Sequence, residues 1–157
     1  MKNNLKNFIS ILFCFFLLSE RVNANEPFTF DVTEIEILDN GNQINGYKNG
    51  VVTTDDGNKI IANTFLYNKL SNILEAKGDV KFIDEIKKIT ITSDKAIYFK
   101  NNEQLFTEGN SKAVSPNNII TASNFDYDKI ENIIRAKKNV KILDNEKDTI
   151  LNANEII

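Results

Sequence analysis

The sequence predicts an all-β protein built from a short repeated unit. Apolar and charged residues alternate along residues 74–82, which is the pattern of a half-buried strand whose successive side chains point to opposite faces. The same pattern returns at residues 134–142 and, more weakly, at residues 105–113. Turns rich in Asn, Asp and Gly separate such segments, and neither Pro27 nor Pro116 interrupts a strand. A strand that recurs at near-constant spacing indicates a repeat architecture.

Residues 1–24 have the composition of a secretory signal peptide. Lys2 and Lys6 give a positive start, and residues 8–18 are an apolar run broken only by a serine. Val22-Asn-Ala24 then supplies the small or modest side chains that a signal peptidase reads. We therefore expect cleavage after this motif and export of the mature chain, with an uncleaved N-terminal anchor as the alternative.

The mature chain, residues 25–157, has the size of one domain, and the sequence leaves open whether that domain continues past the C-terminus. Of the 157 residues, 41% are hydrophobic and 26% are charged, which is typical of a globular protein. The formal charge of −3 argues against nucleic acid as a partner, because phosphate binding needs clustered Lys and Arg.

The residue types that form most catalytic and metal sites are scarce in this sequence. The chain has no histidine, and its single cysteine, Cys14, lies in the predicted signal peptide, which excludes Cys/His metal sites and triads that need either residue. Asp55-Asp56 lies in a turn sequence, so we interpret it as a turn rather than an acid–base pair or a calcium site. Lys87-Lys88 and Lys137-Lys138 are interpreted as solvated surface. We predict no enzymatic activity, no cofactor and no metal.

Each repeat unit reads as strand, turn, strand, turn, and three copies align in register. Tyrosine ends the first strand of every copy, at Tyr67, Tyr98 and Tyr127, with spacings of 31 and 29 residues. A fourth copy begins at Leu151, and residues 28–55 fit a looser leading unit. The expected strands of the three full copies are 60–67 and 74–84, 91–98 and 105–115, and 120–127 and 134–144.

A helical alternative exists for two segments. Apolar residues in 66–74 and 130–134 also have helical spacing, so either segment alone could form a short amphipathic helix. The second copy decides between the two, because residues 98–105 have no apolar stripe and contain an Asn-Asn turn. Copies of one unit should share one structure, so we predict strands throughout.

The repeat motif is I-x-A-[DN]-x-[AF]-x-Y, a turn, and then [LI]-x-A-x-G-[DN]-V-x-[IL]-x-[DN]. It resembles the OstA-like (organic solvent tolerance) domain of lipopolysaccharide transport proteins, well over residues 59–157 and loosely over residues 28–58. The resemblance implies a β-jelly-roll, an open V-shaped stack of antiparallel strands. It also implies a role like that of the periplasmic bridge protein or of the N-terminal domain of the outer-membrane translocon. Two departures are visible, since Lys138 replaces the motif glycine in the third copy and Ser111 replaces the valine in the second.

Together with the alternation rule, the resemblance implies an apolar groove that shields lipid acyl chains from water. A closed core is the alternative, and patterning alone favours it. The parity of the first strand slips between Ala62 and Phe65, so we expect a bulge or bend there. The expected lining residues are Ile60, Ala62, Phe65, Tyr67, Leu74, Ala76, Val80, Phe82, Ile91, Tyr98, Leu105, Ala122, Phe125, Tyr127, Ile134, Ala136, Val140 and Ile142.

We therefore predict a non-catalytic domain that carries lipopolysaccharide toward the outer membrane and resides in the periplasm, free or associated with the outer membrane. Its expected partners are lipopolysaccharide, through the lipid A acyl chains, and other lipopolysaccharide transport proteins. The proteins would join by strand addition at unpaired edges near residues 28–35 and 149–157, which could also support self-association. The rival prediction is an exported β-solenoid adhesin or glycan-binding module, which needs exposed aromatic platforms, whereas the tyrosines fall on the predicted inner face.

Overall fold

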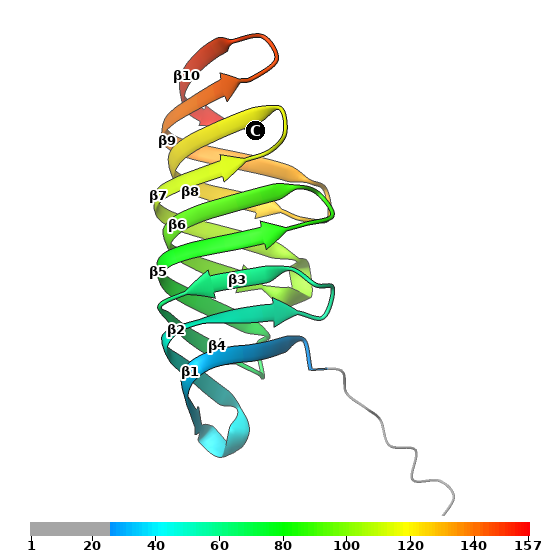
Figure 1. The fold of residues 1–157 in the computed structure, drawn as a ribbon, viewed down its shortest axis with the longest axis vertical. Coiled ribbons are helices and arrows are strands. Elements are labelled where there is room, and N and C mark those ends of the chain that lie inside the picture. The colour runs from blue at the N-terminus through cyan, green and yellow to red at the C-terminus, as the bar shows by residue number, and fades with distance from the viewer. Residues whose placement is uncertain (1–25) are drawn as a thin grey trace, which may run out of the picture.

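The computed structural model describes residues 26–157, and most of them lie in antiparallel strands of one sheet (Figure 1). None of these residues forms a helix long and apolar enough to cross a membrane. Two short 3-10 turns, η1 (Asp39–Gly41) and η2 (Lys100–Asn102), close two of the hairpins. The strands are β1 (Phe28–Leu38), β2 (Gln43–Thr54), β3 (Lys59–Ala62), β4 (Thr64–Asn68), β5 (Ile73–Asp84), β6 (Ile89–Phe99), β7 (Gln104–Val114), β8 (Asn118–Asp128), β9 (Ile133–Asp144) and β10 (Thr149–Ile156).

The strands form a meander in which each one pairs with the next along the chain, from β1 to β10. The single exception is the pair β3 and β4, which together take the place of one strand, because both lie between β2 and β5. They are separated by Asn63, so the bend expected between Ala62 and Phe65 is confirmed. The segments with helical spacing are strands joined by turns, as the comparison of copies predicted.

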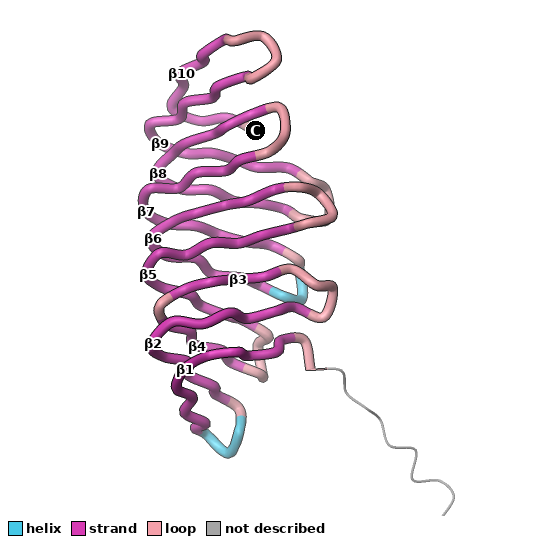
Figure 2. Tube along the Cα trace, viewed as in Figure 1, coloured by secondary structure: helices cyan, strands magenta, loops and turns pink. Residues whose placement is uncertain are grey.

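Every long strand bends near its middle, and the pairing register shifts at each bend. The bends stack along one side of the molecule and the hairpin turns gather along the opposite side, which we call the rim (Figure 2). The two halves of the strands therefore form two walls that meet at the bends, and the predicted β-jelly-roll class is confirmed. The first wall contains residues 28–32, 50–54, 59–62, 80–84, 89–92, 111–114, 118–122, 140–144 and 149–153, and the second contains 34–38, 43–47, 64–68, 73–77, 95–99, 104–108, 124–128, 133–137 and 155–156.

The bends explain the G-[DN] step of the repeat motif. At the bends of β2, β5, β7 and β9 two consecutive residues have positive φ and lie opposite a single residue of the neighbouring strand. Left-handed backbone favours Gly, Asn and Asp over other residues, which is why these residue types recur there. The pairs are Lys48 (φ 60°) with Asn49 (66°) in the leading unit, and Gly78 (78°) with Asp79 (50°), Gly109 (77°) with Asn110 (47°), and Lys138 (64°) with Asn139 (55°) in the three full copies.

Space at the bend decides whether the first residue of the pair must be glycine. A Cβ atom on Gly78 would lie 2.5 Å from Nδ2 and 3.0 Å from Cγ of Asn63, and one on Gly109 would overlap Oδ2 and lie 3.0 Å from Cγ of Asp94. In the third copy the corresponding facing residue is Ser123, which is smaller. Lys138 can therefore occupy the glycine position there, although a residue other than glycine in the left-handed conformation lowers the stability of the fold.

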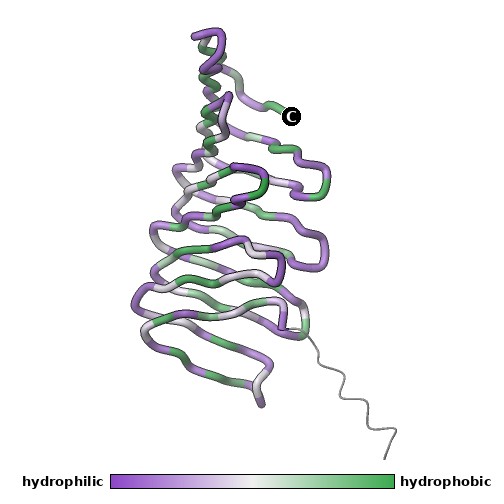
Figure 3. The backbone as a smooth tube through the Cα atoms, turned by 45° about the vertical axis from the view of Figure 1, so that its right-hand side comes forward, coloured by the Kyte–Doolittle hydropathy of each residue, from purple (hydrophilic) through white to green (hydrophobic). Residues whose placement is uncertain are grey.

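The alternation rule places the core correctly. Apolar and polar segments alternate along every strand (Figure 3), and the apolar side chains of the two walls meet in one cluster. Aromatic pairs join the walls directly: Phe28 packs edge-on against Tyr67 with ring centroids 4.8 Å apart. Phe82 lies between Tyr98 and Tyr127, at centroid distances of 6.1 and 6.2 Å.

The second copy carries a polar pair inside this core. Ser111, which replaces the motif valine, is buried, and its hydroxyl lies 2.7 Å from that of Thr107. The Thr107 hydroxyl also accepts a hydrogen bond from the backbone N–H of Phe125, and the Ser111 hydroxyl donates to the carbonyl of Ser123. The substitution therefore replaces apolar packing with a hydrogen-bonded network that satisfies its own polar groups.

Candidate functional site

The inner faces of the two walls bring the predicted groove residues together. Their packing differs from that of an open groove, because the walls contact each other and leave these side chains almost without exposed surface. Ile134 and Ile142 are the two that remain partly exposed. The fully covered ones are Ile60, Ala62, Phe65, Tyr67, Leu74, Ala76, Val80, Phe82, Ile91, Tyr98, Leu105, Ala122, Phe125, Tyr127, Ala136 and Val140. Contact of this face with lipid stays a prediction.

The inner face is accessible at the β9–β10 end of the stack. Leu151 lies opposite Ile142 in the register and so belongs to the inner face, yet 58% of its surface is exposed. Ile156 is likewise only partly covered. The apolar surface is therefore continuous from the packed interior of the first units to an exposed stretch on β9 and β10.

A repeated hydrogen bond ties each inner tyrosine to the turn that follows it. Tyr67 donates to Asn72 at 2.9 Å, and Tyr127 donates to Asn132 at 3.4 Å. Tyr98 donates to Glu103, which occupies the Asn position in the second copy. Burial and then the nearby carboxylate raise the pKa of Tyr98, so its hydroxyl keeps the proton that it donates.

Charged side chains connect the two walls along the rim. Lys100, at the rim of the second wall, forms an ion pair at 2.8 Å with Asp55, at the rim of the first wall. Lys100 also contacts Glu103. Lys129 binds Glu103 at 2.8 Å and contacts Asp56. We call these five residues the rim clasp.

The clasp residues hold one another in their charged forms. Burial raises the pKa of Asp56, but hydrogen bonds from Lys129 and Thr54 outweigh it and bring the pKa down to about 2. For Glu103, burial is likewise outweighed by Lys100 and Lys129, and its pKa lies below the ordinary value. Burial lowers the pKa of both lysines, yet their carboxylate partners leave it above the ordinary value.

Lys87 adds a further contact across the rim, which corrects its interpretation as solvated surface, whereas Lys88 is exposed. Its ammonium group donates to the backbone carbonyl of Lys129 and lies 5.9 Å from the centre of the Tyr127 ring. Next to it, a cavity of about 340 Å³ is bordered by the exposed side chains of Ile86 and Ile130, which come from opposite walls.

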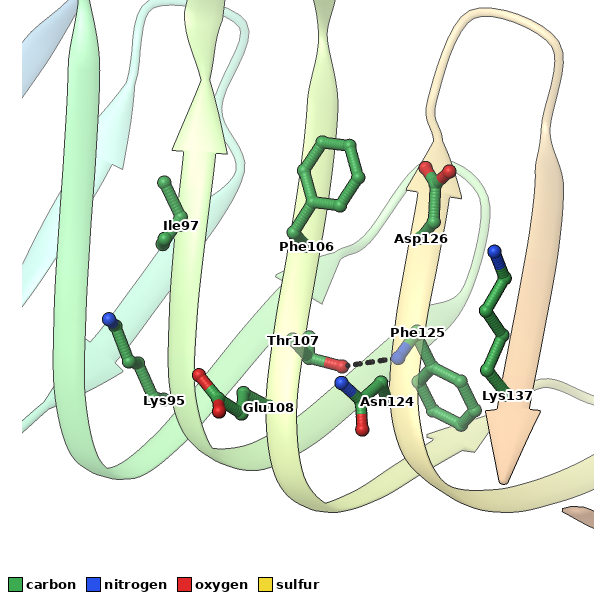
Figure 4. A pocket seen from close by; sticks show the side chains of 9 residues that line it. All are labelled: Lys95, Ile97, Phe106, Thr107, Glu108, Asn124, Phe125, Asp126 and Lys137. Atoms are coloured by element: carbon green, nitrogen blue, oxygen red, sulfur yellow. Dashed lines mark hydrogen bonds between the residues drawn. The ribbon is translucent and has the colours of Figure 1, made fainter. Parts of the chain in front are cut away.

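A second pocket, of about 260 Å³, lies on the outer face of the second wall (Figure 4). Ile97 and Phe106 form its apolar part, with Lys95 and Lys137 at its edges. One carboxylate oxygen of Asp126 is buried there without a hydrogen-bond partner. Its floor includes Thr107 and Phe125, which are buried residues of the interior. Among residues 26–157, no group of three or more acidic side chains is placed to hold a metal ion.

Sequence reasoning missed the rim clasp and the outer pocket. A signal for the clasp is present, because lysine follows the tyrosine by two positions in every copy, at Lys69, Lys100 and Lys129. Lys69 also crosses the rim, to Glu26 at 3.1 Å. The outer pocket has no signal of this kind, since its residues differ between copies.

Comparison with known proteins agrees with this architecture. Among solved structures, the chain is similar to LptH from Pseudomonas aeruginosa, described as the LptA homologous periplasmic component of the conserved lipopolysaccharide transport device, with a TM-score of 0.63 and 16% identity over 71% of this chain and 82% of that one. No curated protein matches the sequence. The family of OstA-like proteins matches residues 28–155, which is nearly all of the described chain. The chain therefore belongs to the OstA-like protein family.

Proposed function

We propose that this chain is a non-catalytic periplasmic domain that carries or bridges lipopolysaccharide toward the outer membrane. Membership of the OstA-like family and the likeness in fold to a periplasmic lipopolysaccharide transport component support this role. The observation that carries it is the continuous apolar inner face, which becomes accessible at Ile142 and Leu151. Acyl chains laid along this face would be shielded from water at about 25 cal/mol for each Å² of apolar area that is covered.

The proposal includes export and the domain boundaries predicted from the sequence. The signal peptide of residues 1–24 lies outside the described residues, so its support is the charged start, the apolar run and the cleavage motif. Residues 25–157 would then be the working domain. Residence in the periplasm, either free or associated with the outer membrane, is part of the same proposal.

Protein partners would add to the edge strands. Among residues 26–157, β1 pairs only with β2, and β10 pairs only with β9. An unpaired edge offers backbone N–H and C=O groups to a further strand, which would continue the sheet and align the inner faces of two molecules. We propose other lipopolysaccharide transport proteins, or a second copy of this chain, as the partners at these edges.

Paired photo-crosslinkers test the lipid contact. Ile142 and Leu151 face inward at the accessible end, whereas Lys141 and Asn152 are their outward-facing neighbours on the same strands. Inward probes should capture purified lipopolysaccharide, and outward probes should not. Equal capture at both faces, or capture at neither, would contradict the proposed lipid path.

A further inference from the structure

The walls are packed together wherever the rim clasp joins them. Between the clasp and the bends lie Phe82, Tyr98 and Leu105, which are almost completely covered. An acyl chain cannot lie between these side chains unless the two walls move apart. Because the walls are continuous at the bends, that movement must open at the rim.

The rim is also where the contacts between the walls are ionic. Three lysines of the second wall's rim reach three carboxylates of the first wall's rim: Lys69 binds Glu26, Lys100 binds Asp55, and Lys129 binds Asp56. Among residues 26–157, no ion pair crosses the rim beyond Lys129. The clasped part of the stack is thus the packed part, and the unclasped part is where the inner face is exposed.

Glu103 is the centre of the clasp and is specific to one copy. The equivalent residues of the first and third copies are Asn72 and Asn132, which accept the tyrosine hydrogen bond without carrying charge. Glu103 accepts the same bond from Tyr98 and also binds Lys100 and Lys129. Its charge is therefore not required for the tyrosine contact, and what it adds is the connection between the two lysines that reach across the rim.

We propose that the rim clasp is a latch that controls lateral opening of the apolar interior. With the latch formed the walls stay in contact, and with Asp55 and Asp56 neutral the walls part at the rim and admit an acyl chain from the side. This inference rests on the proposed function for the identity of the guest, an amphiphile with acyl chains. Opening itself is a property of the protein and can be measured without lipid.

Glu75 and Glu103 provide controls that remove ionic contacts within one wall. Each of these glutamates binds two lysines, and their side chains are 23% and 20% exposed. Both glutamates and all of these lysines belong to the second wall or its rim, so neither cluster alone joins the walls. The links across the clasp run from Lys100 to Asp55 and from Lys129 to Asp56. The double variant Asp55→Asn/Asp56→Asn removes both links, whereas Glu75→Gln and Glu103→Gln leave them in place.

Opening can be read from the reactivity of a buried thiol. Ala113 faces the interior of the first wall and is buried. In the full chain with Cys14→Ser, an Ala113→Cys thiol is modified by a disulfide reagent only when the interior opens. The double variant Asp55→Asn/Asp56→Asn should accelerate this modification roughly tenfold or more, the factor expected for the loss of a charge-assisted hydrogen bond. Glu75→Gln and Glu103→Gln should leave the rate nearly unchanged.

Two further measurements separate the latch from a general loss of stability. Urea unfolding of the double variant and of the two glutamate controls gives their global stability, and the latch requires acceleration by the double variant beyond what any difference in that stability accounts for. Salt of roughly 1 M should accelerate the parent protein and both controls and have little effect on the double variant, because it screens the clasp charges.

The outcomes distinguish this inference from the proposed function. Equal thiol reactivity in the parent protein, the two glutamate controls and the Asp55→Asn/Asp56→Asn protein would overturn the latch, even if lipopolysaccharide still crosslinks at Ile142. Faster thiol reactivity in Asp55→Asn/Asp56→Asn without crosslinking of lipopolysaccharide in any variant would support the latch and overturn the proposed function. Faster reactivity together with increased crosslinking would support both.

Discussion

Replacing Gly109 with alanine should destabilise the domain through the bend of β7. The backbone of Gly109 has φ of +77°, which costs a residue with a Cβ atom about 1–2 kcal/mol. The new Cβ would also overlap Oδ2 and lie 3.0 Å from Cγ of Asp94, so the carboxylate of Asp94 must move. Together the two effects should lower the free energy of unfolding by about 2–3 kcal/mol.

The third copy supplies the compensating change. There a residue with a side chain, Lys138, stands at the glycine position and the facing residue is Ser123. Asp94→Ser should therefore restore about 1 kcal/mol to Gly109→Ala by removing the contact but not the backbone strain. Lys138→Gly alone should raise the free energy of unfolding by about 0.5–1 kcal/mol.

Urea denaturation followed by circular dichroism measures these changes, with Asp94→Ser alone as the control. That control also loses the hydrogen bond from Asn110 to Asp94, so the coupling must be taken from the full double-mutant cycle. If the effects of Gly109→Ala and Asp94→Ser simply add, the facing side chain does not explain the glycine. If Lys138→Gly destabilises the protein, the left-handed strain assigned to this bend is wrong.

Three other predictions follow from the core, the clasp and the N-terminus. Ser111→Val, although it restores the motif residue, should destabilise the domain by about 1–2 kcal/mol in urea titrations, because the Thr107 hydroxyl loses its buried partner; an increase in stability would show that the polar pair contributes nothing. The carboxylates of Asp56 and Glu103 have lowered pKa values, so their stabilisation is complete above the ordinary values of 3.8 and 4.5 and is lost as pH falls through the folded values, which is about 2 for Asp56. The raised pKa values of Lys100 and Lys129 mean that their stabilisation is present below 10.5 and lost as pH rises above it. Thermal melts of the parent and of Glu103→Gln across pH should therefore converge at both extremes, and a constant difference would contradict the assignment. Mass spectrometry of the exported protein should find Asn25 at the N-terminus, whereas an intact Met1 form in the membrane would refute cleavage after Ala24.

The strands and their inner faces could be predicted because alternation is a local property. In β5, for example, Leu74 and Ala76 before the bend and Val80 and Phe82 after it all face inward, as the even spacing requires. The left-handed pair of residues at the bend preserves this parity, so nothing in β5 alone reveals that the strand turns a corner. Only the facing strand shows the slip, between Ala62 and Phe65.

Contacts between copies could not be predicted in the same way. Asp55 and Asp56 have a sufficient local explanation as turn residues, and the sequence gives no reason to place them beside Lys100 and Lys129. Their meeting depends on how far the two walls diverge from the bends to the rim. That angle is set by the packing of the whole interior, to which each strand contributes only a part.

The sequence could not decide between an open groove and a closed core for a similar reason. Both require an apolar inner face, so alternation cannot separate them. In the structure the exposure of the inner face changes along the stack, since Tyr98 is covered and Leu151 is exposed. This change depends on the clasp contacts and on where the stack of strands ends, and no residue of the repeat motif determines it.

Isoleucine methyl NMR with a spin-labelled amphiphile tests the central claim most directly. Isoleucines occupy both faces of the walls, so one labelled sample reports on both. A lipopolysaccharide whose acyl chain carries a nitroxide should broaden the methyl signals of Ile134 and Ile142 first, because these inward-facing residues lie at the accessible end. The outward-facing Ile61, Ile97 and Ile119 should keep their signals. Equal broadening on both faces, or broadening of the outward set alone, would show that acyl chains do not lie along the inner face.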